Sequence, residues 1–298
     1  CVCRLFFVRR ARIFLRNTRI NTPNNRGTGC ALASAIATAL ACGHRLADAV
    51  VIGKMAIQQG LRSAYAIAPQ AGPVFITHFP NAQCDLPELV YQSALAEKTF
   101  ARQAEPFPAP DLPNGESAPL GLYPVVETAQ WVERVLAQGV TTVQLRNKTL
   151  QGDALAQEVN RAVAVAERYN ARLFINDHWQ LAIASGAYGV HLGQEDLAGA
   201  DINAIRRAGL RLGISTHCHY EVARAHALCP SYIACGPVYP TTSKVMPWIP
   251  HGVKGFAYWR KSLDYPLVAI GGINRERIPD VVAAGADGVA MISAITHD

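Results

Sequence analysis

Side chains suited to binding phosphate follow a short apolar run in the second half of the chain. Residues 236–244, with the sequence GPVYPTTSK, carry three hydroxyl residues, Thr241, Thr242 and Ser243, followed by Lys244. Hydroxyls and backbone amides bind phosphate oxygens, and lysine adds a compact positive charge. The stretch therefore predicts an anion-binding loop. On these residues alone, a solvated polar loop remains an alternative.

Two cations follow a second apolar run, in the segment TTVQLRNK. This segment contains Gln144, Arg146 and Lys148. Alternate residues of an extended chain point the same way, so Arg146 and Lys148 can face one ligand. A pair of cations suits a diphosphate group. A surface charge pair is the alternative explanation.

Carboxylates follow two further apolar runs. Asn176 and Asp177 come directly after RLFI, and Gln194, Glu195 and Asp196 come directly after YGVHLG. Two carboxylates that converge from adjacent strands form a hard-oxygen site for Mg²⁺, which often binds one or two carboxylates together with substrate phosphates. Either aspartate could instead cap the amino terminus of a helix.

A possible zinc motif follows the run RLGIS, which ends at Ser215. His217, Cys218 and His219 are residue types that bind metals. Adjacent residues of a regular strand cannot all face one ion, so the sequence does not favour zinc here.

The last two apolar runs end in residues typical of a phosphate site. AIGGI contains the pair Gly271 and Gly272, and VAMIS ends in Ile292 and Ser293. In parallel barrels, a phosphate commonly binds at the loops after the seventh and eighth strands. The strand ends thus predict one diphosphate–Mg²⁺ region and a second phosphate region.

Eight strand-like runs alternate with helical patterns from residue 122 onward. They are LYPVV, TTVQLR, RLFIN, YGVHLG, RLGIS, YIACGPV, PLVAIGG and DGVAMIS. This alternation predicts an α/β fold, namely a parallel (β/α)8 TIM barrel, with a doubly wound sheet as the second choice. A barrel would bring the strand-end residues to one mouth. Because the sequence stops directly after the eighth run, we expect the barrel to lack its last helix and to be destabilised.

A glycine-rich turn opens a small-residue helix near the start of the chain. Gly27, Thr28, Gly29 and Cys30 precede a helical pattern that runs to about Leu40. Unpaired N–H groups at a helix amino terminus bind anions. A tight turn built on the two glycines explains the same residues without a ligand.

Composition limits the classes of function. The chain has 298 residues, of which 50% are hydrophobic and 17% charged, as in globular proteins, and no apolar run is long enough to cross a membrane. The net charge of +6 equals the six arginines of residues 1–20, so nucleic acid is not a predicted partner. The eight cysteines lack zinc spacing, and we expect a reducing, cytoplasmic location. The oligomeric state, including a homo-oligomer, stays open.

Seven motifs, taken together and in order, resemble the thiamine phosphate synthase family over about residues 120–298. They are QLRNK, FINDH, GVHLGQEDL, LGIST, GPVYPTTSK, VAIGGI and VAMISAI. The resemblance implies a transferase of thiamine biosynthesis that joins two small molecules. Hydroxymethylpyrimidine diphosphate loses pyrophosphate by a dissociative, Mg²⁺-assisted mechanism, and a thiazole phosphate then attacks.

The same resemblance implies a role for each strand-end residue. It implies that Asp177 and Asp196 hold Mg²⁺ and that Gln144 and Asn176 contact the pyrimidine. The residues implied for the diphosphate are Arg146, Lys148, Ser215 and Lys244. Those implied for the thiazole phosphate are Thr241, Thr242, Ser243, Gly272, Ile292 and Ser293. Arg146, Lys148 and Lys244 are the expected catalytic residues.

The amino-terminal segment NNRGTGCALASAIA resembles the carboxyl-terminal part of hydroxymethylpyrimidine phosphate kinases, which have a ribokinase-like fold. In that family the GTGC loop, here Gly27, Thr28, Gly29 and Cys30, forms an anion hole. We therefore expect a kinase remnant without kinase activity over residues 1–99. Residues 100–120, with five prolines, are expected to form a linker, and residues 121–298 the barrel. This arrangement resembles a bifunctional kinase–synthase.

Two other functions are compatible with these residues. One is a related barrel that tautomerises a thiazole phosphate and does not need both carboxylates and the cations. The other is an inactive, truncated protein that only binds phosphate ligands.

Overall fold

The computed structural model describes residues 2–8, 11–67, 71–91, 104–241 and 248–296. The chain divides into two compact units. The first unit consists of residues 1–105 together with residues 218–228 and 261–263. The second consists of residues 106–217, 229–260 and 264–298.

The first unit contains an antiparallel sheet and two long helices. The strands lie in the order β1 (Val2–Val8), β2 (Ala11–Arg16) and β3 (Glu88–Tyr91). The two long helices are α1 (Thr28–Ala41) and α2 (Leu46–Arg62). The unit also contains the shorter helix α8 (His219–His226) and the 3₁₀ turn η1 (Gln83–Asp85). The N-cap of α1 is Gly27, whose φ of 76° favours glycine. The helix predicted after the GTGC motif is thus confirmed.

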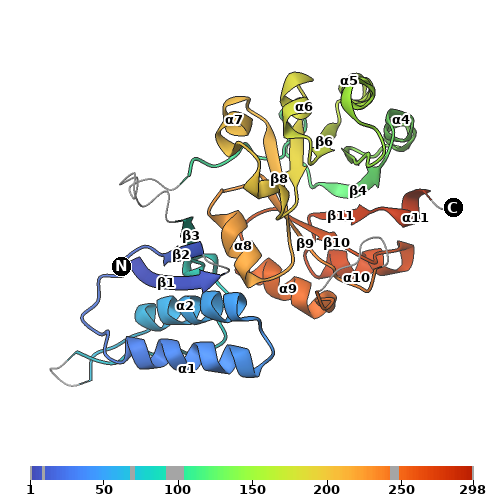
Figure 1. Cartoon of the computed structure of the whole chain (residues 1–298). Helices are drawn as coiled ribbons and strands as arrows, with labels where there is room; N and C mark the ends of the chain where they lie inside the picture. Colours follow the sequence, from blue (N-terminus) through green and yellow to red (C-terminus); the bar gives the residue numbers. More distant parts are fainter. Residues whose placement is uncertain (1, 9–10, 68–70, 92–103, 242–247, 297–298) are drawn as a thin grey trace. The chain divides into compact units, whose positions relative to one another are not determined.

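The second unit contains a closed barrel of eight parallel strands (Figure 1). They are β4 (Gly121–Val126), β5 (Thr142–Leu145), β6 (Arg172–Asn176), β7 (Gly189–Leu192), β8 (Arg211–Thr216), β9 (Tyr232–Cys235), β10 (Leu267–Ile270) and β11 (Gly288–Met291). Strand β11 pairs in parallel with β4 and closes the ring. The predicted barrel is confirmed, and the doubly wound alternative, an open sheet, is wrong.

Helices follow the strands along the chain. They are α4 (Ala129–Leu136), α5 (Gly152–Arg168), α6 (Trp179–Ala184), α7 (Ile202–Arg207), α9 (Gly252–Ser262), α10 (Ile278–Ala283) and α11 (Ser293–Thr296), with the 3₁₀ turns η2 (Asp196–Ala198) and η3 (Arg275–Arg277). In α4, Val132, Val135 and Leu136 are buried, and the Thr128 hydroxyl caps the first turn by accepting from Trp131 N–H. None of the helices in the described part combines the length and apolar character needed to cross a bilayer.

Aromatic rings fill the centre of the barrel. Tyr123, Phe174 and Tyr232 contact one another, with ring centroids 5.1 to 6.0 Å apart. Two glycines leave room for these rings. A Cβ atom at Gly189 would lie 2.6 Å from the Phe174 ring, and one at Gly213 would lie 2.1 Å from Tyr232 Cζ. The small residues on β7 and β8 therefore admit large side chains from β6 and β9.

Residues 106–120 lie against the amino-terminal ends of the strands. The fully buried Arg172, the first residue of β6, donates hydrogen bonds to the backbone carbonyls of Pro110 at 2.9 Å, Ala118 at 2.8 Å and Pro119 at 2.6 Å. The segment expected to be a linker is thus fixed to the barrel by a buried guanidinium. The boundaries of the predicted domains stay a prediction.

Candidate active site

The loops after β5 and β6 bring a predicted cation and a predicted carboxylate together. Lys148 Nζ donates to Asp177 Oδ2 at 2.6 Å. The turn that carries Lys148 is fixed by Asn147, whose Oδ1 accepts from the N–H groups of Thr149 at 3.0 Å and Leu150 at 2.7 Å. The lysine predicted for the diphosphate is therefore adjacent to a predicted metal ligand.

Neither predicted metal ligand caps a helix. His178, not Asp177, is the N-cap of α6, and no side chain caps that helix. Asp177 has a φ of 63°, and its N–H donates to the His191 carbonyl at 3.0 Å, which fixes the end of β6 to β7. Asp196 begins η2 and folds back over Gly193, where a Cβ atom would lie 2.9 Å from Asp196 Oδ2. The capping alternative is thus wrong for both aspartates.

The two carboxyl groups are close enough to change each other's titration. Burial, and then the neighbouring charge of Asp177, raise the pKa of Asp196. Burial acts to raise the pKa of Asp177 as well, but the hydrogen bond and charge of Lys148 outweigh it and lower that pKa. Two neighbouring carboxylates that repel each other suit a divalent cation. In the described part of the chain, histidine, cysteine and acidic residues form no cluster of three or more suited to a metal ion.

A buried hydrogen-bond network lies in the barrel interior next to these loops. Gln144 Nε2 donates to the Tyr123 hydroxyl at 3.4 Å, and the hydroxyls of Tyr123 and Tyr232 are 2.8 Å apart. His191 bridges the Tyr232 hydroxyl, 2.7 Å from Nδ1, and Ser215 Oγ, 2.8 Å from Nε2. Burial lowers the pKa of His191 to about 4, so the imidazole is neutral at neutral pH. The network joins two predicted substrate-binding residues, Gln144 and Ser215.

Sequence reasoning missed three members of this network: Tyr123, His191 and Tyr232. A period-two signal was present, because His191 follows the inward-facing Gly189 by two residues, and Ser215 follows the inward-facing Gly213 by two. The partners of these side chains lie on other strands, so only the barrel reveals the hydrogen bonds.

The other side of the mouth is built from the loops after β9 and β10. Val238 N–H donates to the Ile270 carbonyl and Tyr239 N–H to the Gly271 carbonyl, each at 2.9 Å. Gly272 has a φ of 65°, and a Cβ atom there would lie 2.3 Å from the Pro240 carbonyl oxygen. A residue with a side chain therefore cannot replace Gly272 without moving the loops after β9 and β10.

The TTSK stretch continues from this loop pair. Thr241 is described, whereas Thr242, Ser243 and Lys244 lie outside the described residues. Their assignment to phosphate and diphosphate stays a prediction.

Three more predicted residues lie at strand ends of the barrel. Asn176 is the last residue of β6 and is 9% exposed. Ile292 follows β11 and packs against the interior cluster, and Ser293 begins α11.

Two predicted motifs are not part of this mouth. Gly27, Thr28, Gly29 and Cys30 belong to the first unit, and their role as an anion hole stays a prediction. The His217 ring stacks on Trp248, with centroids 5.8 Å apart, whereas Cys218 and His219 belong to the first unit.

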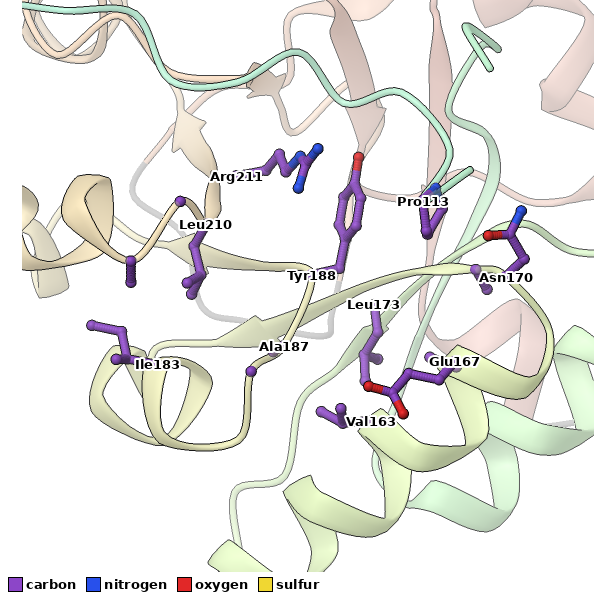
Figure 2. Close-up of a pocket in the computed structure, with 15 residues that line it drawn as sticks. Pro113, Val163, Glu167, Asn170, Leu173, Ile183, Ala187, Tyr188, Leu210 and Arg211 are labelled. Atoms are coloured by element: carbon purple, nitrogen blue, oxygen red, sulfur yellow. The ribbon is translucent and has the colours of Figure 1, made fainter. Parts of the chain in front are cut away.

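A cavity of about 420 Å³ opens at the opposite end of the barrel strands (Figure 2). It lies between the last turns of α5 and α6, the residues that follow α7, and the starts of β6, β7 and β8. Figure 2 shows Tyr188 and Arg211 beside each other, with the guanidinium carbon 4.5 Å from the ring centroid. No predicted site residue lines this cavity, so it is separate from the strand-end site.

The closed ring of eight parallel strands, each but the last connected to the next through a helix, places this chain in the (β/α)8 fold class. The Thiamine monophosphate synthase family model matches residues 122–295, more than half of the chain. The chain belongs to this family. The Phosphomethylpyrimidine kinase model matches residues 2–75. Both resemblances seen in the sequence are confirmed.

Close relatives carry the same family name. The thiamine-phosphate synthase of Photorhabdus laumondii subsp. laumondii is 56% identical over 191 residues, covering 62% of this chain and 88% of the relative. That of Yersinia pestis (strain Pestoides F) is 55% identical over 188 residues, covering 63% and 87%. Among solved structures, thiamine phosphate pyrophosphorylase from Pyrococcus furiosus matches with 30% identity and a TM-score of 0.52, covering 59% of this chain and 86% of that chain.

Proposed function

We propose that the strand-end site of the barrel joins hydroxymethylpyrimidine diphosphate to thiazole phosphate, giving thiamine phosphate and pyrophosphate. The chain is a thiamine-phosphate synthase, a transferase of thiamine biosynthesis. The observation that best supports the proposed chemistry is the cluster of Lys148, Asp177 and Asp196 at three neighbouring strand ends. It combines a cation for phosphate oxygens with a carboxylate pair for a metal.

The reaction needs no protein nucleophile. The bond between the pyrimidine methylene carbon and the diphosphate oxygen breaks, and both electrons leave with the diphosphate. The resulting cation is delocalised over the pyrimidine, and the thiazole nitrogen lone pair forms the new carbon–nitrogen bond. The protein's task is to stabilise the negative charge that develops on the leaving group. Arg146, Lys148 and Lys244 are the cations proposed for this task, together with the hydroxyl of Ser215.

Asp177 and Asp196 would hold Mg²⁺. When bound, the ion supplies positive charge to the leaving diphosphate. The two carboxylates fit this role because they repel each other and lie at neighbouring strand ends. Lys148 donates to Asp177, so the residues proposed for the metal and for the diphosphate form one contiguous cluster.

The remaining residues divide between the two substrates. Gln144 and Asn176, both buried on the inner face of the strands, would contact the pyrimidine ring. The ends of β9, β10 and β11 would hold the thiazole phosphate through Thr241, Thr242, Ser243, Gly272, Ile292 and Ser293. We also propose a cytoplasmic location, since Cys30, Cys42, Cys84, Cys218, Cys229 and Cys235 are free thiols.

Pyrophosphate release tests the proposal. The full chain is mixed with both substrates and Mg²⁺, and each component is omitted in turn, with EDTA replacing the metal. We expect release only from the complete mixture, and loss of release in Asp177→Asn.

Asp201→Asn is the matched control, because Asp201 caps α7 by accepting from Ala204 N–H at 2.9 Å, and asparagine caps equally well. Release without thiazole phosphate, or full activity of Asp177→Asn, would contradict the proposal. A folded protein that only tautomerises thiazole phosphate would favour the related barrel reaction instead.

A further inference from the structure

Three side chains connect two proposed substrate-binding residues through the barrel interior. The sequence of hydrogen bonds is Gln144, Tyr123, Tyr232, His191 and Ser215, with heavy-atom distances of 3.4, 2.8, 2.7 and 2.8 Å. The three middle members are at most 5% exposed, so water does not compete with their hydrogen bonds.

The first member sets the direction of the bonds. An amide nitrogen only donates, so the Tyr123 oxygen accepts from Gln144 Nε2. Tyr123 then donates its single hydrogen to Tyr232, and Tyr232 donates to His191 Nδ1. A ring nitrogen that accepts a hydrogen bond carries no hydrogen, so the imidazole hydrogen is on Nε2, which donates to Ser215 Oγ.

This direction leaves the two end residues with defined hydrogen-bonding roles. The Ser215 hydroxyl accepts from His191, so its own hydrogen is available for an anionic oxygen. Gln144 donates one of its two N–H hydrogens to Tyr123, which sets the orientation of the amide and leaves its carbonyl oxygen available for an N–H group of a ligand. In the opposite direction, Ser215 would donate to His191 and present only lone pairs to a diphosphate. Tyr123 would then accept twice, and its hydrogen would have no acceptor within this set of residues.

We infer that His191 is a positioning residue that, through Tyr232 and Tyr123, fixes Ser215 as a donor to the diphosphate and Gln144 as an acceptor for the pyrimidine. The inference rests on the proposed function, since Ser215 and Gln144 are assigned to the pyrimidine diphosphate there. It assigns to Tyr123, Tyr232 and His191 the role of orienting Gln144 and Ser215, the two residues proposed to contact the substrate.

The test is Tyr232→Phe, which removes one hydroxyl and keeps the ring. Without the donor to Nδ1, the imidazole hydrogen can move to Nδ1, and Ser215 can turn its own hydrogen towards Nε2. We expect the KM for hydroxymethylpyrimidine diphosphate to rise by about 10-fold to 100-fold, the effect of one hydrogen bond to a charged group. The KM for thiazole phosphate should stay within about 2-fold, because no member of the network is assigned to it.

Three further variants separate positioning from stability. Tyr188→Phe removes a tyrosine hydroxyl outside the network, one that is partly buried and donates to the Asp111 carbonyl at the far end of the barrel. It should lower the melting temperature without raising either KM. His191→Gln places an amide nitrogen near Ser215 and should recover much of the activity that His191→Leu loses.

A double-mutant cycle identifies the route of the effect. In a Ser215→Ala background, Tyr232→Phe should cause little further rise in the KM for the pyrimidine diphosphate. An unchanged KM in Tyr232→Phe, or an equally large rise in the Ser215→Ala background, would overturn the inference. Failure of the proposed function has a different signature, because the unsubstituted chain would then release no pyrophosphate.

Discussion

Replacing Gly213 by alanine tests whether the packing of the barrel interior sets the geometry of the site. A Cβ atom at this position would lie 2.1 Å from Tyr232 Cζ and 2.3 Å from its hydroxyl oxygen. Carbon atoms pack at about 3.5–4.0 Å, so the tyrosine ring must move by roughly 1.4 Å or more. The hydrogen bonds of Tyr232 to Tyr123 and His191, now 2.8 and 2.7 Å long, cannot both survive such a shift.

The expected loss of stability follows from two contributions. Overpacking a closed core costs about 1–3 kcal/mol, and each lost hydrogen bond costs about 1 kcal/mol net. We therefore expect the free energy of unfolding of the Gly213→Ala protein to fall by about 2–5 kcal/mol. For a barrel of this size, that corresponds to a melting temperature lower by roughly 5–15 °C. Circular dichroism measures the melting temperature, and pyrophosphate release measures the KM for the pyrimidine diphosphate, which should rise.

Gly199→Ala is the matched control, because the nearest atom to a Cβ there is the Asp196 carbonyl oxygen at 3.9 Å, and its φ of −103° suits any residue. This variant should melt and turn over like the unsubstituted chain. Tyr232→Leu removes the obstructing ring, so adding Gly213→Ala to it should cost much less than adding it alone. A Gly213→Ala protein with unchanged melting temperature and unchanged KM would refute the argument from interior packing.

Three further predictions concern other parts of the barrel. Arg172→Met leaves three carbonyls of residues 106–120 without their buried donor, so the free energy of unfolding measured in urea should fall by about 2–4 kcal/mol. Proteases should also cut this segment faster. An unchanged urea midpoint would show that the segment is not anchored by Arg172. Gly272→Ala puts a Cβ atom 2.3 Å from the Pro240 carbonyl oxygen, so the KM for thiazole phosphate should rise at least about 10-fold while that for the pyrimidine diphosphate changes little. Asp196→Asn should raise the Mg²⁺ concentration needed for half-maximal pyrophosphate release by about 10-fold or more, and unaltered Mg²⁺ dependence would remove Asp196 from the metal site.

Much of the barrel was predictable because each of its strands is a short apolar run bounded by turn residues. A strand buried on both faces needs only such a run, so RLFIN and PLVAIGG indicate strands without any tertiary information. The anchoring of residues 106–120 was not predictable in this way. Their five prolines indicate a stiff connection, but the buried Arg172 that binds them belongs to a strand more than 50 residues away.

The candidate site also contains residues that the sequence could predict and residues that it could not. Asp177 and Lys148 were predicted because they directly follow strands, and the strand ends of a parallel barrel converge at one mouth. His191 lies within a strand, and its period-two spacing from Gly189 indicates only that it faces the barrel interior, as an ordinary core residue does. Its role depends on Tyr232, whose ring reaches it only because Gly213 has no side chain. Side-chain contacts between strands that are far apart in the sequence could thus not be predicted from the sequence.

Strand β7 and the residues that follow it hold several parts of the proposed site in place. The His191 carbonyl accepts from Asp177 N–H at 3.0 Å, and the His191 side chain contacts Ser215 Oγ at 2.8 Å. Gln194, just after the strand, donates to the Ser215 carbonyl at 2.8 Å, and Asp196 follows two residues later. The proposed metal ligands and the proposed diphosphate hydroxyl are therefore fixed to the same short segment. A displacement of β7 should weaken metal and diphosphate binding together, whereas substitutions in the loops after β9 and β10 should affect the thiazole phosphate alone.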